Sequence, residues 1–227
     1  MAFAVDLRRR VVSEALGTAF LLATVVGSGI MGERLCGGNV AIALLANALA
    51  TGSSLAALIL TFAPISGAHF NPVVTVANAI RGDHPWREVP LYVTGQTLGA
   101  FVGVAASHVM FGQPVFSVSH HSRSGIGQVF SEFVATFGLL AVIWSCSRTR
   151  ASAVPFAVGS YIAAAYWFTA STSFANPAVT AARAFTNTFA GIRPADTPAF
   201  IFAQLIGAAV ATVALGWLFT APSGKEP

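Results

Sequence analysis

Six apolar runs, each long enough to cross a lipid bilayer, constrain this chain more than any other feature. They lie at about residues 11–31, 39–62, 89–111, 127–147, 154–170 and 198–220. A membrane-spanning helix requires about 20 apolar residues, so six spans account for most of a chain of 227 residues. Only 9% of the residues are charged, compared with about 25% in soluble domains. We therefore expect a single all-α membrane domain over residues 1–227, and the composition excludes a soluble protein or a nucleic-acid partner.

The basic residues give the expected orientation in the lipid bilayer. If both termini are cytoplasmic, eight of the 12 lysines and arginines lie in inner segments and four in outer ones. This bias is typical of inner-membrane proteins, and it predicts a multi-pass protein of the bacterial inner (cell) membrane. The first apolar run contains Glu14 and exceeds the core of a signal peptide, so it predicts a transmembrane helix.

An internal repeat divides the chain into halves at about residues 8–112 and 127–220. Three pairs of segments match in the same order: EALGTAFLL with EFVATFGLL, HFNPVVT with FANPAVT, and GQTLGAFVG with AQLIGAAVA. The paired segments are 118, 105 and 108 residues apart. Each half contains three spans, and an odd number of spans gives the two halves opposite orientations. Such inverted repeats place a binding site near the bilayer midplane.

Each half also contains one apolar segment too short to span a bilayer, at about residues 70–80 and 176–187. Each segment opens with an Asn-Pro pair, at Asn71 and Asn176. Asparagine is a good N-cap and proline suits the first helical turn. Broken spans are tolerated only inside protein or beside a water-filled cavity. We expect two half-helices that meet at their N-termini, whose partial positive charges disfavour cations while the asparagine amides bind neutral solutes.

These motifs resemble those of the aquaporin, or major intrinsic protein, family over about residues 8–220. The resemblance rests on SGAHFNPVVT at 66–75, on ANPAVT at 175–180, and on a glutamate–threonine pair in each half, at Glu14 and Glu132. It implies an hourglass of six transmembrane helices and two re-entrant half-helices around one pore per protomer. It also implies a homotetramer that conducts water and small uncharged solutes without a cofactor.

The resemblance assigns roles to particular residues at the pore midpoint and around it. The midpoint residues are Asn71, Pro72, Val73, Asn176, Pro177 and Ala178. Val73 replaces the alanine of the family motif, and we expect it to reshape the midpoint slightly. Glu14 and Glu132 are implied to brace the re-entrant loops by accepting backbone N–H bonds, and His69 matches the loop histidine of the family.

The outer constriction departs from that of water-selective members of the family. The resemblance places its four residues at Thr51, Ser173, Val179 and either Tyr166 or Ala164. Valine therefore stands where these members have arginine, and Arg183, one turn further along, is the candidate to replace it in part. Without the arginine and one aromatic ring, we expect a wider opening that admits polyols or undissociated metalloid acids such as arsenite.

Two further segments, TVVGSGIMGERL at 24–35 and YWFTASTSFANPAVT at 166–180, resemble bacterial aquaporins associated with arsenic-resistance genes. The alternative is a secondary transporter, because transporters also use inverted repeats and broken helices. Ion coupling usually requires ionisable groups at the midplane, whereas Glu14 and Glu132 lie near helix ends. An enzyme is not expected, because there is no HExxH motif and Cys36 and Cys146 have no metal-ligand spacing.

Overall fold

The computed structural model describes residues 5–219; residue 220, the predicted end of the last span and of the second half, lies outside this range. Within it, eight α-helices are Leu7–Leu35 (α1), Val40–Ser66 (α2), Pro72–Ile80 (α3), Val89–Met110 (α4), Ile126–Thr149 (α5), Val154–Phe168 (α6), Pro177–Arg183 (α7) and Thr197–Phe219 (α8). Short 3-10 turns precede α4, α6 and α8 at Trp86–Glu88, Ala151–Ala153 and Pro194–Asp196. No strand occurs among the described residues. The predicted all-α fold is confirmed, and six helices are long and apolar enough to cross a membrane.

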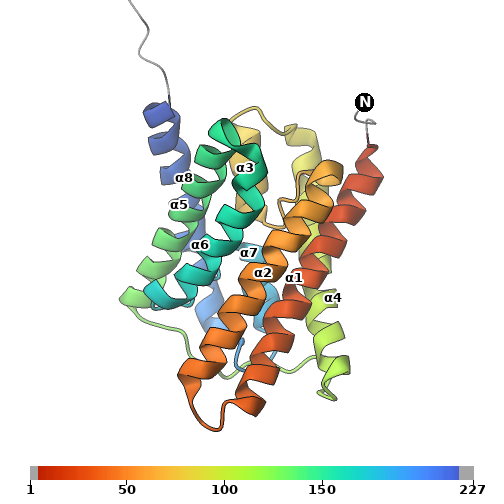
Figure 1. The fold of residues 1–227 in the computed structure, drawn as a ribbon, viewed down its shortest axis with the longest axis vertical. Coiled ribbons are helices and arrows are strands. Elements are labelled where there is room, and N and C mark those ends of the chain that lie inside the picture. The colour runs from red at the N-terminus through yellow and green to blue at the C-terminus, as the bar shows by residue number, and fades with distance from the viewer. Residues whose placement is uncertain (1–4, 220–227) are drawn as a thin grey trace, which may run out of the picture.

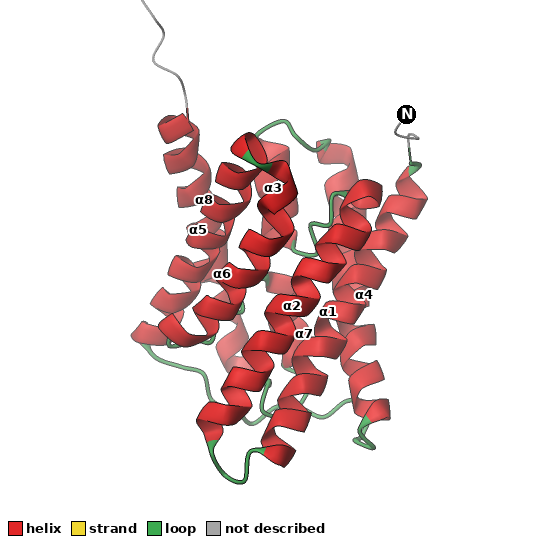
Figure 2. Ribbon diagram, viewed as in Figure 1, coloured by secondary structure: helices red, strands yellow, loops and turns green. Residues whose placement is uncertain are grey.

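The six long helices surround the two short ones (Figures 1 and 2). The first described helix begins, and α8 ends, at the same end of the bundle, as an even number of spans requires (Figure 1). Both α3 and α7 pack against α4 and α8, and they also contact each other. The two half-helices therefore lie at the centre of the bundle, between the halves of the repeat.

The half-helices begin at the Asn-Pro pairs. Asn71 Oδ1 accepts a hydrogen bond from Val73 N at 3.1 Å, and Asn176 Oδ1 accepts one from Ala178 N at 3.0 Å. The second half-helix is shorter than the predicted segment 176–187: α7 ends at Arg183. The chain then folds back, and the Ile192 N–H donates to the Arg183 carbonyl at 3.2 Å. This bond satisfies one of the carbonyls that a helix end leaves free.

A stripe of glycines lets α4 approach α1 closely. A Cβ atom on Gly99 would overlap the carbonyl oxygen of Ala15, and one on Gly103 would overlap that of Ala19. Small residues at such intervals allow backbones to pack directly in membranes. The same device recurs between α8 and α5, where a Cβ on Gly207 would lie 2.6 Å from the Phe133 carbonyl oxygen.

We expect Gly99→Ala to lower the stability of the channel markedly, because the added methyl group meets rigid backbone. Overpacking of this kind costs about 1–3 kcal/mol or more. Gly127→Ala is the matched control, since a Cβ there meets nothing within 4 Å, and alanine favours a helix by up to about 1 kcal/mol. Thermal unfolding in detergent, followed by intrinsic fluorescence, checks both variants. Equal melting temperatures for the two would contradict the close approach of α1 and α4.

Candidate functional site

A cavity of about 320 Å³ lies between the half-helices and the long helices that surround them. Of the predicted site residues, its wall contains Thr51, His69, Asn71, Tyr166, Ser173, Asn176 and Val179, together with Arg183. The other predicted residues lie outside this wall: Glu14, Pro72, Val73, Glu132, Ala164, Pro177 and Ala178. Much of the remaining surface is apolar and includes Leu21, Val25, Leu55, Ile59, Leu139 and Ile162.

The two asparagines lie together where the half-helices meet. Asn71 Nδ2 donates to the Ala175 carbonyl at 2.7 Å, and Asn176 Nδ2 donates to the Phe70 carbonyl at 2.8 Å. Each amide is therefore fixed by the opposite loop. Because an amide nitrogen carries two hydrogens, each asparagine retains one donor for the cavity that it lines.

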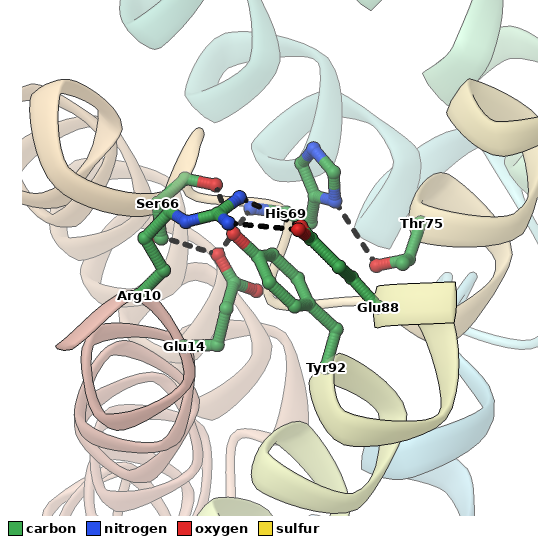
Figure 3. Close-up of polar contacts among 7 residues, drawn as sticks. All are labelled: Arg10, Glu14, Ser66, His69, Thr75, Glu88 and Tyr92. Atoms are coloured by element: carbon green, nitrogen blue, oxygen red, sulfur yellow. Dashed lines mark hydrogen bonds and ion pairs between the residues drawn. The ribbon is translucent and has the colours of Figure 1, made fainter. Parts of the chain in front are cut away.

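Glu14, in α1, holds the first re-entrant loop (Figure 3). Its Oε1 accepts from His69 N at 2.9 Å and from Ser66 Oγ at 2.6 Å. Its Oε2 accepts from Phe70 N at 2.7 Å and from Gln96 Nε2 at 2.8 Å. The side chain is fully buried, so these four donors replace the water that a carboxylate would otherwise require.

Glu132 holds the second loop in the corresponding way. Its Oε1 accepts from Phe174 N at 2.9 Å, and its Oε2 accepts from Ala175 N at 2.8 Å and Gln204 Nε2 at 2.6 Å. The two carboxylates thus satisfy backbone donors of loops that have no regular secondary structure. A buried loop is stable only when such donors are paired.

In each half of the repeat, one glutamine joins the buried carboxylate to the half-helix. Gln96 Nε2 also donates to Thr75 Oγ1 in α3, and Gln204 Nε2 to Thr180 Oγ1 in α7, both at 2.9 Å. The sequence identified these glutamines only as members of the repeat and gave them no role. Their recurrence in both halves was the available signal, because a polar side chain repeated in two spans needs a partner in both.

The backbone before each asparagine adopts a left-handed conformation. Phe70 has φ 49° and Ala175 has φ 48°, and each such conformation costs about 1–3 kcal/mol for a residue other than glycine. The N–H groups of these same two residues are bound by Glu14 and Glu132. The carboxylates therefore stabilise the strained turns that aim the asparagines into the cavity.

The residues predicted for the outer constriction lie on three helices and the second re-entrant loop. Thr51 in α2 contacts Tyr166 in α6, with Oγ1 3.3 Å from the hydroxyl oxygen. Ser173 in the second loop and Val179 in α7 line the same cavity. Of the two alternatives in the fifth span, Tyr166 faces the cavity, whereas Ala164 is exposed on the outer face of α6.

Comparison with known proteins decides the family. Residues 1–173 match the profile described as Major intrinsic protein. The chain belongs to the major intrinsic protein family. It is 52% identical over 213 residues to aquaglyceroporin AqpS of Rhizobium meliloti (strain 1021), covering 94% of this chain and 91% of that protein. It is 36% identical over 129 residues to the probable aquaporin NIP7-1 of Arabidopsis thaliana, covering 56% of this chain and 46% of that protein.

The fold of this family member is also that of a solved structure. The aquaglyceroporin from Plasmodium falciparum superposes with a TM-score of 0.73 at 21% identity, covering 92% of this chain and 95% of that chain. The resemblance predicted from the sequence is therefore confirmed at the level of family and fold. As a family member, the chain is a passive membrane channel for water and small neutral solutes.

His69, in the first re-entrant loop of the channel, uses both ring nitrogens. Its Nδ1 lies 3.1 Å from Thr75 Oγ1 (Figure 3), and its Nε2 lies 3.1 Å from Asn78 Nδ2. Asn78 in turn accepts from Trp144 Nε1 at 3.2 Å. The histidine thus joins the loop to the body of α3 and, through Asn78, to α5.

His84 completes a group of aromatic rings at the end of the channel where α1 begins. Its ring centroid is 4.4 Å from that of Tyr92 and 5.3 Å from that of His69, and its buried Nε2 has no hydrogen-bond partner within residues 5–219. Arg10 and Glu88 form a two-bond ion pair nearby, at 2.8 and 3.0 Å (Figure 3). Burial lowers the pKa of His84 below its ordinary value of 6.5, against the opposing effect of the Glu88 carboxylate.

This lowered pKa makes the channel less stable in acid. The unfolded chain binds a proton at His84 more readily than the folded channel does, so the free energy of unfolding falls as the pH drops below about 6.5. The slope is at most about 1.4 kcal/mol per pH unit, and it ends once the pH is below the pKa of His84 in the folded channel. We expect His84→Phe to retain the ring packing and to flatten this slope. Thermal unfolding in detergent between pH 7.5 and 5 measures it. Parallel pH profiles for the variant and the parent protein would contradict this role.

Proposed function

We propose that this channel conducts polyols such as glycerol and undissociated metalloid acids such as arsenous acid, in addition to water. The observation that carries the proposal is the uncharged set of side chains at the predicted outer constriction. Val179 stands there in place of arginine and lines the same cavity as Thr51, Tyr166 and Ser173. The relatives named aquaglyceroporins, including AqpS of Rhizobium meliloti, support the same class of solute.

The chemistry of this wall suits a solute that has both hydroxyl groups and carbon atoms. Thr51, Tyr166 and Ser173 offer hydroxyls, and the Ser173 oxygen has no protein partner within the described residues. Val179, in contrast to these three residues, supplies an apolar surface that suits the carbon atoms of the solute. Replacing arginine by valine removes a long side chain with five donors, which leaves room for molecules larger than water.

The midpoint contributes selectivity against cations, which the uncharged side chains of the constriction do not provide. The amides of Asn71 and Asn176 donate to passing oxygen atoms, and the N-termini of α3 and α7 carry partial positive charge. Val73, which departs from the family motif, is 1% exposed and lies outside the cavity wall. We infer that the valine is accommodated behind the asparagine and leaves conduction intact.

The setting of the channel is also part of this proposal. We place it in the bacterial inner membrane with both termini in the cytoplasm, on the basis of the arginine distribution. The family supports a homotetramer, in which each protomer keeps its own pore. Many exposed apolar side chains on the long helices, such as Phe20, Leu98 and Phe202, suit contact with lipid or with other protomers.

A secondary transporter is the competing class, and concentration dependence separates the two. No glutamate lines the cavity, and Asp83 is the single aspartate among the described lining residues, so coupling groups at the midpoint are lacking there. In proteoliposomes we expect glycerol flux to rise linearly with concentration and to ignore pH and sodium gradients. Saturable flux that follows an ion gradient would support the transporter.

The channel is expected to respond weakly to mercurials. Its cysteines, Cys36 and Cys146, both lie outside the cavity wall, whereas Ser173 lies in it. Ser173→Cys should create a site at which a mercurial blocks water and glycerol flux by about ten-fold or more. Stopped-flow light scattering before and after a thiol reductant measures this. Strong block of the parent channel that Cys36→Ser or Cys146→Ser removes would contradict the placement of these cysteines.

A further inference from the structure

Arg183 lies at the end of α7, in the wall of the cavity. It is 2% exposed, which is exceptional for a charged side chain. Its guanidinium carbon lies 3.4 Å from the centre of the Phe174 ring, and its Nε donates to the Ala190 carbonyl. The side chain is therefore held in one position by a stacked ring and a hydrogen bond.

Arg183 forms no ion pair in the described part of the chain. No carboxylate between residues 5 and 219 forms an ion pair with it; the four ion pairs there involve Arg9, Arg10, Arg81 and Arg193. Its two terminal nitrogens also have no hydrogen-bond acceptor among these residues. Because the side chain lines the cavity, these donors are directed to whatever occupies it.

Arg123 contacts the same aromatic ring as Arg183 but has a structural role. It lies over the same Phe174 ring, at 5.2 Å, and donates to the carbonyls of Gly191 at 2.7 Å and of Phe189 and Ser171 at 3.3 Å. Its guanidinium is thus occupied by the backbone, and it does not line the cavity. Arg183 differs in both respects.

We propose that Arg183 is the charged selectivity residue of this channel, placed one helical turn beyond Val179. Four residues of α-helix separate the two Cα atoms by about 6 Å along the axis. The channel then has an uncharged constriction at Val179 and a separate cationic collar at Arg183. This separation admits solutes larger than water at the constriction, while the collar repels cations and donates to the hydroxyl oxygens of neutral solutes.

This inference rests on the proposed conduction pathway, and the expected effect is on ion exclusion. A charge that has no ion-pair partner and lies close to the path of an ion changes the barrier substantially at the low dielectric of a buried site. We expect Arg183→Leu to raise proton and sodium leak by about ten-fold or more relative to the parent channel. Arg183→Lys should keep the leak low, because it retains the charge.

The test uses proteoliposomes that contain a pH-sensitive or sodium-sensitive dye. Arg34→Leu is the matched control, since it removes the same charge from an exposed residue that does not line the cavity. Arg183→Gln keeps a hydrogen-bond donor and loses the charge. Its proton and sodium leak is measured as the second neutral variant, in case Arg183→Leu does not fold. The double variant Val179→Arg/Arg183→Leu moves the charge back by one turn and should restore ion exclusion.

Glycerol and water flux, measured on the same vesicles, test the conduction pathway separately from the role of Arg183. The proposal is supported if the leak rises in Arg183→Leu or Arg183→Gln, stays low in Arg183→Lys and Arg34→Leu, and falls again in the double variant. Leak that is unchanged in both neutral variants would overturn it. Leak that rises equally in Arg183→Lys would also overturn it, because the effect would then follow packing and not charge.

Discussion

Val179→Arg is expected to reduce glycerol and arsenous acid flux by about ten-fold or more, while water permeability stays within about three-fold of the parent channel. Val179 lines the same cavity as Thr51, Tyr166 and Ser173. A guanidinium there fills much of the opening, and water is small enough to pass it and to accept its hydrogen bonds. A ten-fold loss corresponds to about 1.4 kcal/mol in the barrier. Permeabilities are compared by stopped-flow light scattering at matched protein density.

Two further variants separate size from charge in this experiment. Val179→Met adds length without charge, and Thr51→Phe adds bulk from α2. If bulk alone closes the constriction, both should reduce polyol flux in the same direction as Val179→Arg. Unchanged glycerol and arsenous acid flux in Val179→Arg would show that Val179 does not line the narrowest point, and Tyr166 or Arg183 would then be the residue to examine.

Glu14→Ala is expected to prevent accumulation of folded channel or to lower its stability by about 3–5 kcal/mol. The carboxylate accepts hydrogen bonds from the backbone of His69 and Phe70 and from two side chains. Removing it leaves buried donors unsatisfied, at about 1–3 kcal/mol each. It also releases the left-handed conformation of Phe70, so the first asparagine loses its position.

Glu33→Ala is the matched control for this variant, because Glu33 is exposed near the end of the same helix. Detergent size-exclusion chromatography and thermal unfolding measure both. The control should behave as the parent channel, since exposed charges contribute little. A Glu14→Ala channel that unfolds at the parent temperature would show that the loop is held by its other contacts alone.

The long helices could be predicted because bilayer thickness sets their length directly. Each predicted span overlaps one helix of the structure, with ends that differ by a few residues. The start of each half-helix could also be predicted, since Asn-Pro combines an N-cap residue with a residue suited to the first helical turn. The end of α7 at Arg183 was not, because it depends on the Ile192 backbone folding back from a distant part of the loop.

Side-chain contacts between distant segments were the part that the sequence could not specify. The choice between Tyr166 and Ala164 depends on the helical register of α6, which an unknown loop length leaves open. The stacking of Arg183 on Phe174 brings together residues whose spacing along the chain carries no known pattern. Gln96 and Gln204 were visible as repeated residues, yet their bonds to the buried carboxylates required the three-dimensional arrangement.

We propose that this channel passes solutes larger than water through an opening without the usual arginine. The most direct measurement is the permeability of purified channel in proteoliposomes to glycerol and to arsenous acid, each relative to water. We predict that both solutes enter several-fold faster than in protein-free liposomes, and that the ratio to water falls in Val179→Arg. Rapid water flux with glycerol and arsenous acid entering no faster than in protein-free liposomes would contradict the claim.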